Sequence, residues 1–226
     1  NRIPNNRRIK KQWASRPEGG SVDYVTSIED LPLYEGDWLI LARTNDKLIK
    51  LKSILQEMAI YFEIKGRKSY KTRLYTAVKH YTRWTNGDKL SLSECKDLFE
   101  YLELDQELKE ERMYDLQEFG YNTTDEWYEV FKSDPEECLY IREMLRNKEE
   151  LSHPARVKLS TIHSAKGGEA TNVLLILDNT KKIREAVDKS EDKHDEEHRV
   201  WYVGVTRTKQ NLYIMTPKRE DRSYDI

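Results

Sequence analysis

The chain has 226 residues, and its 39 lysines and arginines against 41 aspartates and glutamates give a formal charge of −2. A near-neutral chain does not attract nucleic acid through its total charge, so any partner has to be inferred from local sites. At about 100 to 200 residues per domain, this length allows one large domain or two small ones. The longest apolar run, residues 173–177, is far shorter than the roughly 20 residues of a membrane-spanning helix, so we expect no membrane partner.

The cysteines and the N-terminus favour an intracellular protein. Cys95 and Cys138 stand far apart, without a CxxC pattern, which favours reduced thiols over a disulfide. No basic segment followed by an apolar stretch resembles a signal peptide, so we expect a cytoplasmic location. The first residue is Asn1 rather than Met, which suggests a piece of a longer protein.

The first part of the chain alternates between strand and helix patterns. After a basic start at residues 2–11, which is either a solvated arm or a phosphate-facing edge, residues 21–27 alternate as in a half-buried strand. Residues 37–42 form a continuous apolar run, which is typical of a fully buried strand. From Asn45 onward apolar residues recur at helical spacing, and residues 61–65 predict a third strand. This order suits a parallel α/β sheet.

The next stretch, residues 70–153, is rich in glutamate, lysine, leucine and tyrosine and lacks β-type runs. Ser91 and Glu94 have the spacing of a reciprocal helix cap, and Asp134 before Pro135 indicates the start of another helix. We therefore predict a helical module here.

Strand patterns return after this module, at residues 157–161, 173–178 and 212–216, with a helix expected over 195–206.

The whole pattern predicts a discontinuous α/β domain with a parallel sheet. Its two halves are residues 1–69 and 154–226, and the helical module at 70–153 interrupts them as an insertion.

A polar loop follows the strand that ends at Thr161. It carries His163, Ser164, Lys166, Gly167 and Gly168. Loops at the carboxyl ends of parallel strands are where α/β sheets bind ligands, and paired glycines let a backbone approach a phosphate closely. An ordinary glycine turn explains the loop equally well. The GxxxxGK[ST] pattern of a Walker phosphate loop does not occur in the sequence.

A second segment places Arg207 near the end of an apolar-faced helix, just before a strand. A planar guanidinium on a fixed base suits the stabilisation of charge on a transferring phosphoryl group. The alternative is an exposed arginine that caps the helix C-terminus through the helix dipole.

Together the two segments, TIHSAKGGE and EEHRVWYVGVTRTKQNLYI, resemble motifs V and VI of the UvrD/Rep family of superfamily 1 DNA helicases. The stretch LILARTNDKLIKLKSILQEMAIYFEIKGRKSYKTRLYTAVKHYTRW and the stretch NNRRIKKQW are also similar to that family. The resemblance covers roughly residues 5–85 and 155–216. It implies a RecA-like, P-loop NTPase-type fold, with this chain as the second RecA-like domain and residues 70–153 as an accessory insertion.

The resemblance also implies a nucleotide site. Arg207 matches the arginine that reaches the γ-phosphate and is the expected catalytic residue, and Glu169 matches a glutamate that contacts the ribose. Gly167 and Lys166 fall in the loop that couples the nucleotide to the DNA. The implied cofactor is ATP with Mg²⁺, held mainly by a first RecA-like domain that we expect to precede this chain as an absent partner domain.

The DNA-binding residues implied by the resemblance are Thr161, His163, Lys166, Arg43 and Asn45. A cluster at Lys65, Arg67, Lys68, Lys71 and Arg73, with Tyr70 among it, is either a patch that tracks single-stranded DNA by phosphate contact and stacking or a solvated helix start. Lys68 is the member that we assign to DNA binding.

Several residues depart from the family pattern or gain no role from it. The departures are Gly168, Ala170, His198, Tyr61 and Arg67. We interpret Tyr202 as core packing. His80, His153 and His194 are taken as structural without partners at metal-ligand spacing, and no metal site is expected.

The sequence is thus identified as resembling the C-terminal fragment of an ATP-dependent DNA helicase. We expect the whole protein to translocate on single-stranded DNA from 3′ to 5′ and to unwind partly duplex DNA, and the fragment alone to be inactive. The alternative is a non-catalytic nucleic-acid-binding or adaptor domain that keeps the helicase fold. A helicase-nuclease is a third option, but no cluster of carboxylates with a lysine follows residue 210.

Overall fold

The computed structural model describes residues 19–104, 108–120, 125–165, 167–217 and 224. The basic start at residues 2–11 and Lys166 lie outside this part of the chain. The chain divides into two compact units, a sheet unit made from Asn1–Arg67 and Ser152–Ile226 and a helical unit made from Lys68–Leu151. The role of the helical unit as a helicase insertion stays a prediction.

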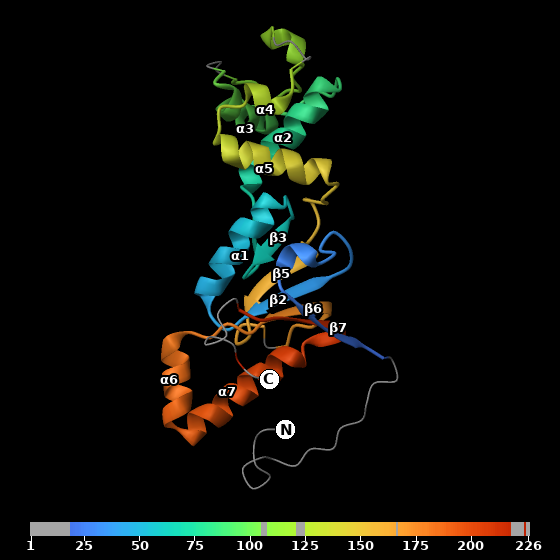
Figure 1. Ribbon diagram of the computed structural model, residues 1–226. Helices are drawn as coiled ribbons and strands as arrows, with labels where there is room; N and C mark the ends of the chain where they lie inside the picture. The colour runs from blue at the N-terminus through green and yellow to red at the C-terminus, as the bar shows by residue number, and fades with distance from the viewer. Residues whose placement is uncertain (1–18, 105–107, 121–124, 166, 218–223, 225–226) are drawn as a thin grey trace. The chain divides into compact units, whose positions relative to one another are not determined.

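The sheet unit is an α/β structure whose strands come from both halves of the sequence (Figure 1). The strands are β1 (Ser21–Val25), β2 (Trp38–Ala42), β3 (Phe62–Ile64), β4 (Arg67–Lys68), β5 (Val157–Thr161), β6 (Ala170–Ile176) and β7 (Thr208–Met215). Their order in the sheet is β1-β7-β6-β2-β5-β3-β4, and every pair from β1 to β3 is parallel. The predicted parallel sheet is confirmed.

The strand β2 lies at the centre of this sheet, between β5 and β6. All five of its side chains are buried, as the apolar run predicted. A strand with helices over both faces has no solvent-facing side, which explains why its hydrophobicity does not alternate.

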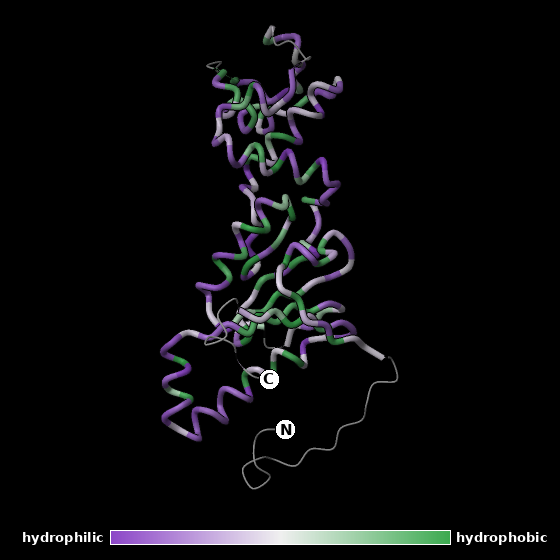
Figure 2. Tube along the Cα trace, viewed as in Figure 1, coloured by the Kyte–Doolittle hydropathy of each residue, from purple (hydrophilic) through white to green (hydrophobic). Residues whose placement is uncertain are grey.

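Each face of the sheet packs against a helix. On one face, Leu48, Leu51 and Leu55 of α1 (Asn45–Glu57) join a buried cluster with Ile40 and Leu174. On the opposite face, Trp201 of α7 (Glu191–Val205) packs in a second cluster with Leu41, Leu175 and Leu212. Figure 2 shows the hydrophobic colouring concentrated on the strands between these helices.

Two expectations for the sheet unit are wrong. The strand β1 is not half-buried, because it lies at the sheet edge and its Val22 and Tyr24 are 60% and 73% exposed. Tyr202 is not a core residue, because Trp201 takes the core-facing position of α7 and the next side chain along a helix points about 100° away. Tyr202 is 48% exposed.

The segment that joins β6 to α7 forms a helix, α6 (Lys181–Lys189), that the sequence analysis did not predict. None of its residues is buried, and Figure 2 shows it as mainly hydrophilic. Within the described ranges, no helix is long and apolar enough to cross a membrane.

The helical unit contains α2 (Thr72–Thr85), α3 (Leu92–Leu102), α4 (Trp127–Val130) and α5 (Pro135–Arg146), with a 3₁₀ turn at Leu116–Phe119. The predicted cap of α3 is present in full, since Ser91 accepts from the Glu94 amide and the Glu94 carboxylate accepts from the Ser91 amide. Asp134 caps α5 through the Glu136 amide.

Both cysteines of this unit, Cys95 and Cys138, are free and buried.

Candidate functional site

The described site residues that were predicted in the sheet unit lie at the two opposite ends of its strands. We call the side where the strands end the carboxyl edge and the side where they begin the amino edge. Thr161 ends β5 and Arg43 follows β2, so both lie at the carboxyl edge, where Ala42 and Thr161 are in register. Glu169 precedes β6 and Arg207 precedes β7, so both lie at the amino edge, where Ala170 pairs with Thr208.

This separation corrects the expectation that the whole loop after Thr161 lies at the carboxyl ends of the strands. Because β5 and β6 both run parallel to β2, the connection between them has to travel the length of the sheet. His163 therefore stays at the carboxyl edge, and Gly167 and Gly168 reach the amino edge beside Arg207.

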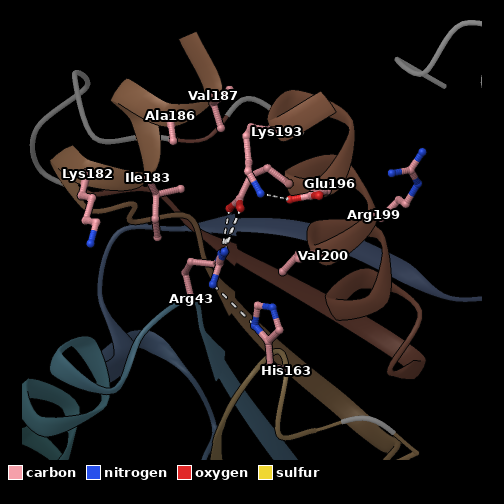
Figure 3. Close-up of a pocket in the computed structure, with 11 residues that line it drawn as sticks. Arg43, His163, Lys182, Ile183, Ala186, Val187, Lys193, Glu196, Arg199 and Val200 are labelled. Carbon is pink, nitrogen blue, oxygen red and sulfur yellow. Dashed lines mark hydrogen bonds and ion pairs between the residues drawn. The ribbon is translucent and has the colours of Figure 1, made fainter. Parts of the chain in front are cut away.

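At the carboxyl edge, Arg43 is held by a buried carboxylate of α7 (Figure 3). Its Nε lies 2.9 Å and 3.1 Å from the two carboxylate oxygens of Glu197, and its Nη2 lies 2.9 Å from Oε2. The side chains of Arg43 and Glu197 are only 18% and 5% exposed. A bidentate pair of this kind fixes the orientation of the guanidinium and neutralises most of its charge. The remaining Nη1 lies 3.5 Å from Nδ1 of His163.

The ends of β5 and β2 supply further polar groups at this edge. Thr161 donates its hydroxyl proton to the Ser164 hydroxyl at 2.9 Å and accepts from the Ser164 amide at 3.3 Å, which closes a tight turn. His163 and Asn45 are exposed, and Asn45 begins α1 without a side-chain cap from Thr44.

A cavity of about 490 Å³ lies beside Arg43 and His163, between α6 and α7. Its lining includes Glu197 of α7 and Ile183, Ala186 and Val187 of α6, and Figure 3 shows these three α6 side chains above Arg43. The cavity thus combines apolar side chains of α6 with charged side chains of both signs, including the paired Arg43 and Glu197.

At the amino edge, Arg207 is held by neutral oxygen atoms. Its Nε donates to the Val203 carbonyl at 3.1 Å, its Nη1 to the Gly168 carbonyl at 3.4 Å and its Nη2 to the Thr206 hydroxyl at 3.3 Å. Within the described ranges no carboxylate pairs with Arg207, so its positive charge is oriented but not neutralised.

The loop that contacts Arg207 has the backbone freedom that the glycine pair predicted. Gly167 has a φ of +90°, and Gly167 and Glu169 are both exposed. The Ala170 amide donates to the Arg207 carbonyl at 3.1 Å, which fixes Glu169 beside Arg207. Lys166, the predicted coupling residue, is outside the described residues.

Lys68 is the last residue of β4 and the first residue of the helical unit, and its side chain is engaged in the structure of that unit. Its Nζ lies 3.0 Å from the Tyr70 hydroxyl and 3.0 Å from the Leu151 carbonyl. Tyr70 is 5% exposed and packs edge-on against Tyr75, so it is not the exposed stacking platform that the cluster predicted. A DNA role of Lys68 stays a prediction.

Two features of α7 were missed in the sequence. Glu197 lies on the helix face of Trp201 and Gly204, and an acid within an apolar stripe is a signal for a buried partner. His194 was taken to lack a partner, but His198 one turn later lies 3.2 Å from it between Nε2 atoms. The spacing of four residues was the available signal, because side chains so placed share a helix face.

The fold defines a RecA-like α/β domain, with polar side chains gathered at both ends of its strands. The model of the UvrD-like helicase C-terminal domain matches residues 40–219, so the chain belongs to this family. The match includes every predicted site residue of the sheet unit and the whole helical unit. A comparison with curated proteins found no match.

Proposed function

We propose that this chain is the second RecA-like domain of an ATP-dependent DNA helicase that moves along single-stranded DNA and unwinds duplex DNA. The observation that carries the proposal is the state of Arg207, a cation held in place by neutral acceptors at the amino edge of the sheet. Movement from 3′ to 5′ is part of the proposal and rests on the resemblance to UvrD/Rep helicases.

The contrast between the two arginines supports a nucleotide at the amino edge. The charge of Arg43 is compensated by Glu197, whereas the described residues place no carboxylate on Arg207. An arginine fixed in this way can neutralise the negative charge that develops on the γ-phosphate oxygens during transfer to water. Its bond to the Gly168 carbonyl, at 3.4 Å, is long and easily exchanged for a phosphate oxygen.

The neighbouring residues fit ATP with Mg²⁺. Glu169 offers a carboxylate that can accept from ribose hydroxyls, and Gly167 leaves the backbone open to a close approach because it has no side chain. The sequence has no Walker pattern, so most of the phosphate and metal contacts fall to a first RecA-like domain with such a loop. In this proposal, Arg207 completes that site from the side of the second domain.

The carboxyl edge suits a nucleic-acid backbone. His163 and Asn45 offer exposed donors, Thr161 holds the turn that carries His163, and Arg43 keeps one guanidinium nitrogen on the His163 side. Contacts of this kind hold a nucleic-acid strand through its phosphates and do not depend on its base sequence. Lys166 is proposed to join them.

The helix α7 connects the two edges. Glu197 on its second turn holds Arg43, and its last turn presents the Val203 carbonyl to Arg207. A shift of α7 caused by phosphate binding would therefore move the group that orients Arg43. This connection gives the proposed coupling between hydrolysis and strand movement a physical element.

The test is DNA-stimulated ATP hydrolysis by the protein that carries this chain together with a Walker-containing domain. We expect Arg207→Ala to lower kcat by about 10³-fold or more while ATP binding persists, because an arginine finger acts in the transition state. Lys209→Ala is the matched control, since it removes an exposed cation two residues further along the chain. We expect it to keep normal turnover.

The opposite results would favour another function. If the native protein shows no DNA-stimulated turnover, or if Arg207→Ala equals it, the motor proposal fails. The chain would then be a nucleic-acid-binding or adaptor domain that keeps the helicase fold.

A further inference from the structure

The histidine pair of α7 lies outside both edges of the sheet. His194 and His198 are four residues apart on one helix face, and their Nε2 atoms are 3.2 Å apart. The rings are nearly perpendicular, with an interplanar angle of 85° and centroids 4.3 Å apart. The same nitrogen of each ring thus lies next to that of the other.

The outer ring nitrogen of His198 has an oxygen partner, since its Nδ1 lies 2.6 Å from the Tyr224 hydroxyl. Nδ1 of His194 lies 3.8 Å from Oδ1 of Asp195, which is beyond hydrogen-bond distance. Asp195 is 3% exposed, and Tyr224 is fixed because its ring stacks on Trp201 at 5.1 Å. Metal-binding histidines show this division of roles, with Nε2 on the ion and the Nδ1 proton directed to an oxygen of a supporting residue.

The separation of the two Nε2 atoms fits a bridging ion. With metal–nitrogen bonds of about 2.0 to 2.1 Å and a tetrahedral angle, two ligating nitrogens lie about 3.3 Å apart. The two nitrogen atoms therefore already have the separation of two ligands of one ion, and a rotation of the rings would aim both of them at it. Without a metal, the two Nε2 atoms are joined by a hydrogen bond at this distance.

We propose that His194 and His198 form a binding site for a divalent transition-metal ion of the imidazole-preferring class, with Zn²⁺ as the representative ion. His194 is exposed and His198 is half-buried, so an ion can enter from solvent. Within the described ranges, no group of three or more His, Cys, Asp or Glu side chains is placed to hold a metal. Water completes the coordination, as in other open zinc sites.

Metal binding at this pair requires a change of tautomer in His198. In the metal-free chain, Nε2 of His198 can donate its proton to His194 while Nδ1 accepts from the Tyr224 hydroxyl. When the ion binds, that proton moves to Nδ1 of the same ring, and the Tyr224 oxygen becomes the acceptor. Both imidazoles stay neutral, and both Nε2 lone pairs go to the ion.

The bound ion would strengthen the contact between α7 and Tyr224, because Tyr224 supports the ligand His198. Tyr224 also donates its amide proton to the Leu177 carbonyl at 3.1 Å, beyond the end of β6. The proposed site therefore stabilises the packing of α7 on the sheet.

The experiment is calorimetric titration of the tag-free chain with zinc chloride in a buffer that does not bind metals. We expect one saturable ion per chain. We also expect His194→Gln and His198→Gln each to weaken the affinity by at least about tenfold, since even the loss of a supporting residue has an effect of this size. His153→Gln is the control, because it removes an exposed histidine away from the pair, and its affinity should match that of the native chain.

A second variant separates the proposed site from casual binding at an exposed histidine. Tyr224→Phe keeps the ring that stacks on Trp201 and removes only the hydroxyl, so we expect a folded chain with affinity weakened about tenfold. The proposal is overturned if the native chain shows no saturable 1:1 binding, or if either histidine variant binds as the native chain does. Unchanged affinity in Tyr224→Phe would overturn the part assigned to Tyr224.

Discussion

Two arginines of the sheet unit illustrate how the surroundings of a side chain decide its role. Arg43 is paired on two atoms with Glu197 in a setting where both side chains are largely buried. Arg207 meets only carbonyl and hydroxyl oxygens within the described ranges. The sequence predicted a functional role for both. Only the structure distinguishes a compensated cation from an uncompensated one.

The first stability prediction concerns this compensation. Glu197→Gln should lower the free energy of unfolding by about 3 kcal/mol, because it leaves a mostly buried guanidinium without its carboxylate. Glu196→Gln is the matched control, since its exposed pair with Lys193 on the same helix is worth well under about 1 kcal/mol. Urea unfolding of both variants measures the difference. Equal midpoints would show that the Arg43 pair contributes no more than a surface ion pair.

At the residue scale, the sequence identified candidate site residues better than it identified the partners that these residues contact. The motif resemblance assigned Arg207, Glu169 and Gly167 to one nucleotide site, and the structure has a hydrogen bond from Arg207 to the carbonyl of the neighbouring Gly168. The partner of Arg43 was missed, because Glu197 is distant in sequence and its burial depends on how α7 packs on the sheet. Tyr70 was misjudged for a similar reason, since only packing decides whether a ring near lysines is buried.

At the scale of elements, short sequence patterns predicted individual helices and strands correctly. They did not predict the path of the chain between these elements. The cap at Ser91 and Glu94, the start of α5 at Pro135 and the buried strand β2 all follow from patterns a few residues long. The crossing of the loop after Thr161 to the opposite edge follows from the parallel order of β5, β2 and β6, which no local pattern contains. The exposure of β1 likewise results from its edge position.

The cap of α3 makes the helical unit sensitive to acid. The pKa of Glu94 is held below its ordinary value of 4.5, chiefly because its carboxylate accepts from the Ser91 amide, with further help from Arg83 and opposition from burial. A carboxyl group whose pKa is lowered by folding contributes stability above its unfolded pKa. That contribution is lost as the pH falls through the lower folded value.

Glu94→Gln should therefore destabilise the chain at neutral pH and have a much smaller effect below about pH 4. The measurement is the urea midpoint of the native chain and the variant across this range. Glu100→Gln is the control on the same helix, because its pair with Arg73 is largely exposed on both sides and should contribute little at any pH. A pH-independent difference between native and Glu94→Gln would contradict the assignment.

At the scale of the whole molecule, the chain forms two compact units, and each has buried hydrophobic residues of its own. Leu174 of β6 and Leu98 of α3 are both 0% exposed, one in each unit. Replacing a buried leucine by alanine leaves a cavity and costs about 2 to 5 kcal/mol. The chain passes between the units at residues 67–68 and 151–152, and we expect each substitution to act mainly on its own unit.

Native-state amide hydrogen exchange measures this, because it reports the opening free energy of each segment separately. Leu98→Ala should reduce the protection of α2 and α3 and leave β2 and β6 protected as before. Leu174→Ala should do the reverse. If either variant lowers protection equally in both units, the chain opens as a single cooperative body. The helical unit would then be part of the sheet unit's stability rather than an addition to it, and any movement of the sheet unit during a nucleotide cycle would have to carry the helical unit with it.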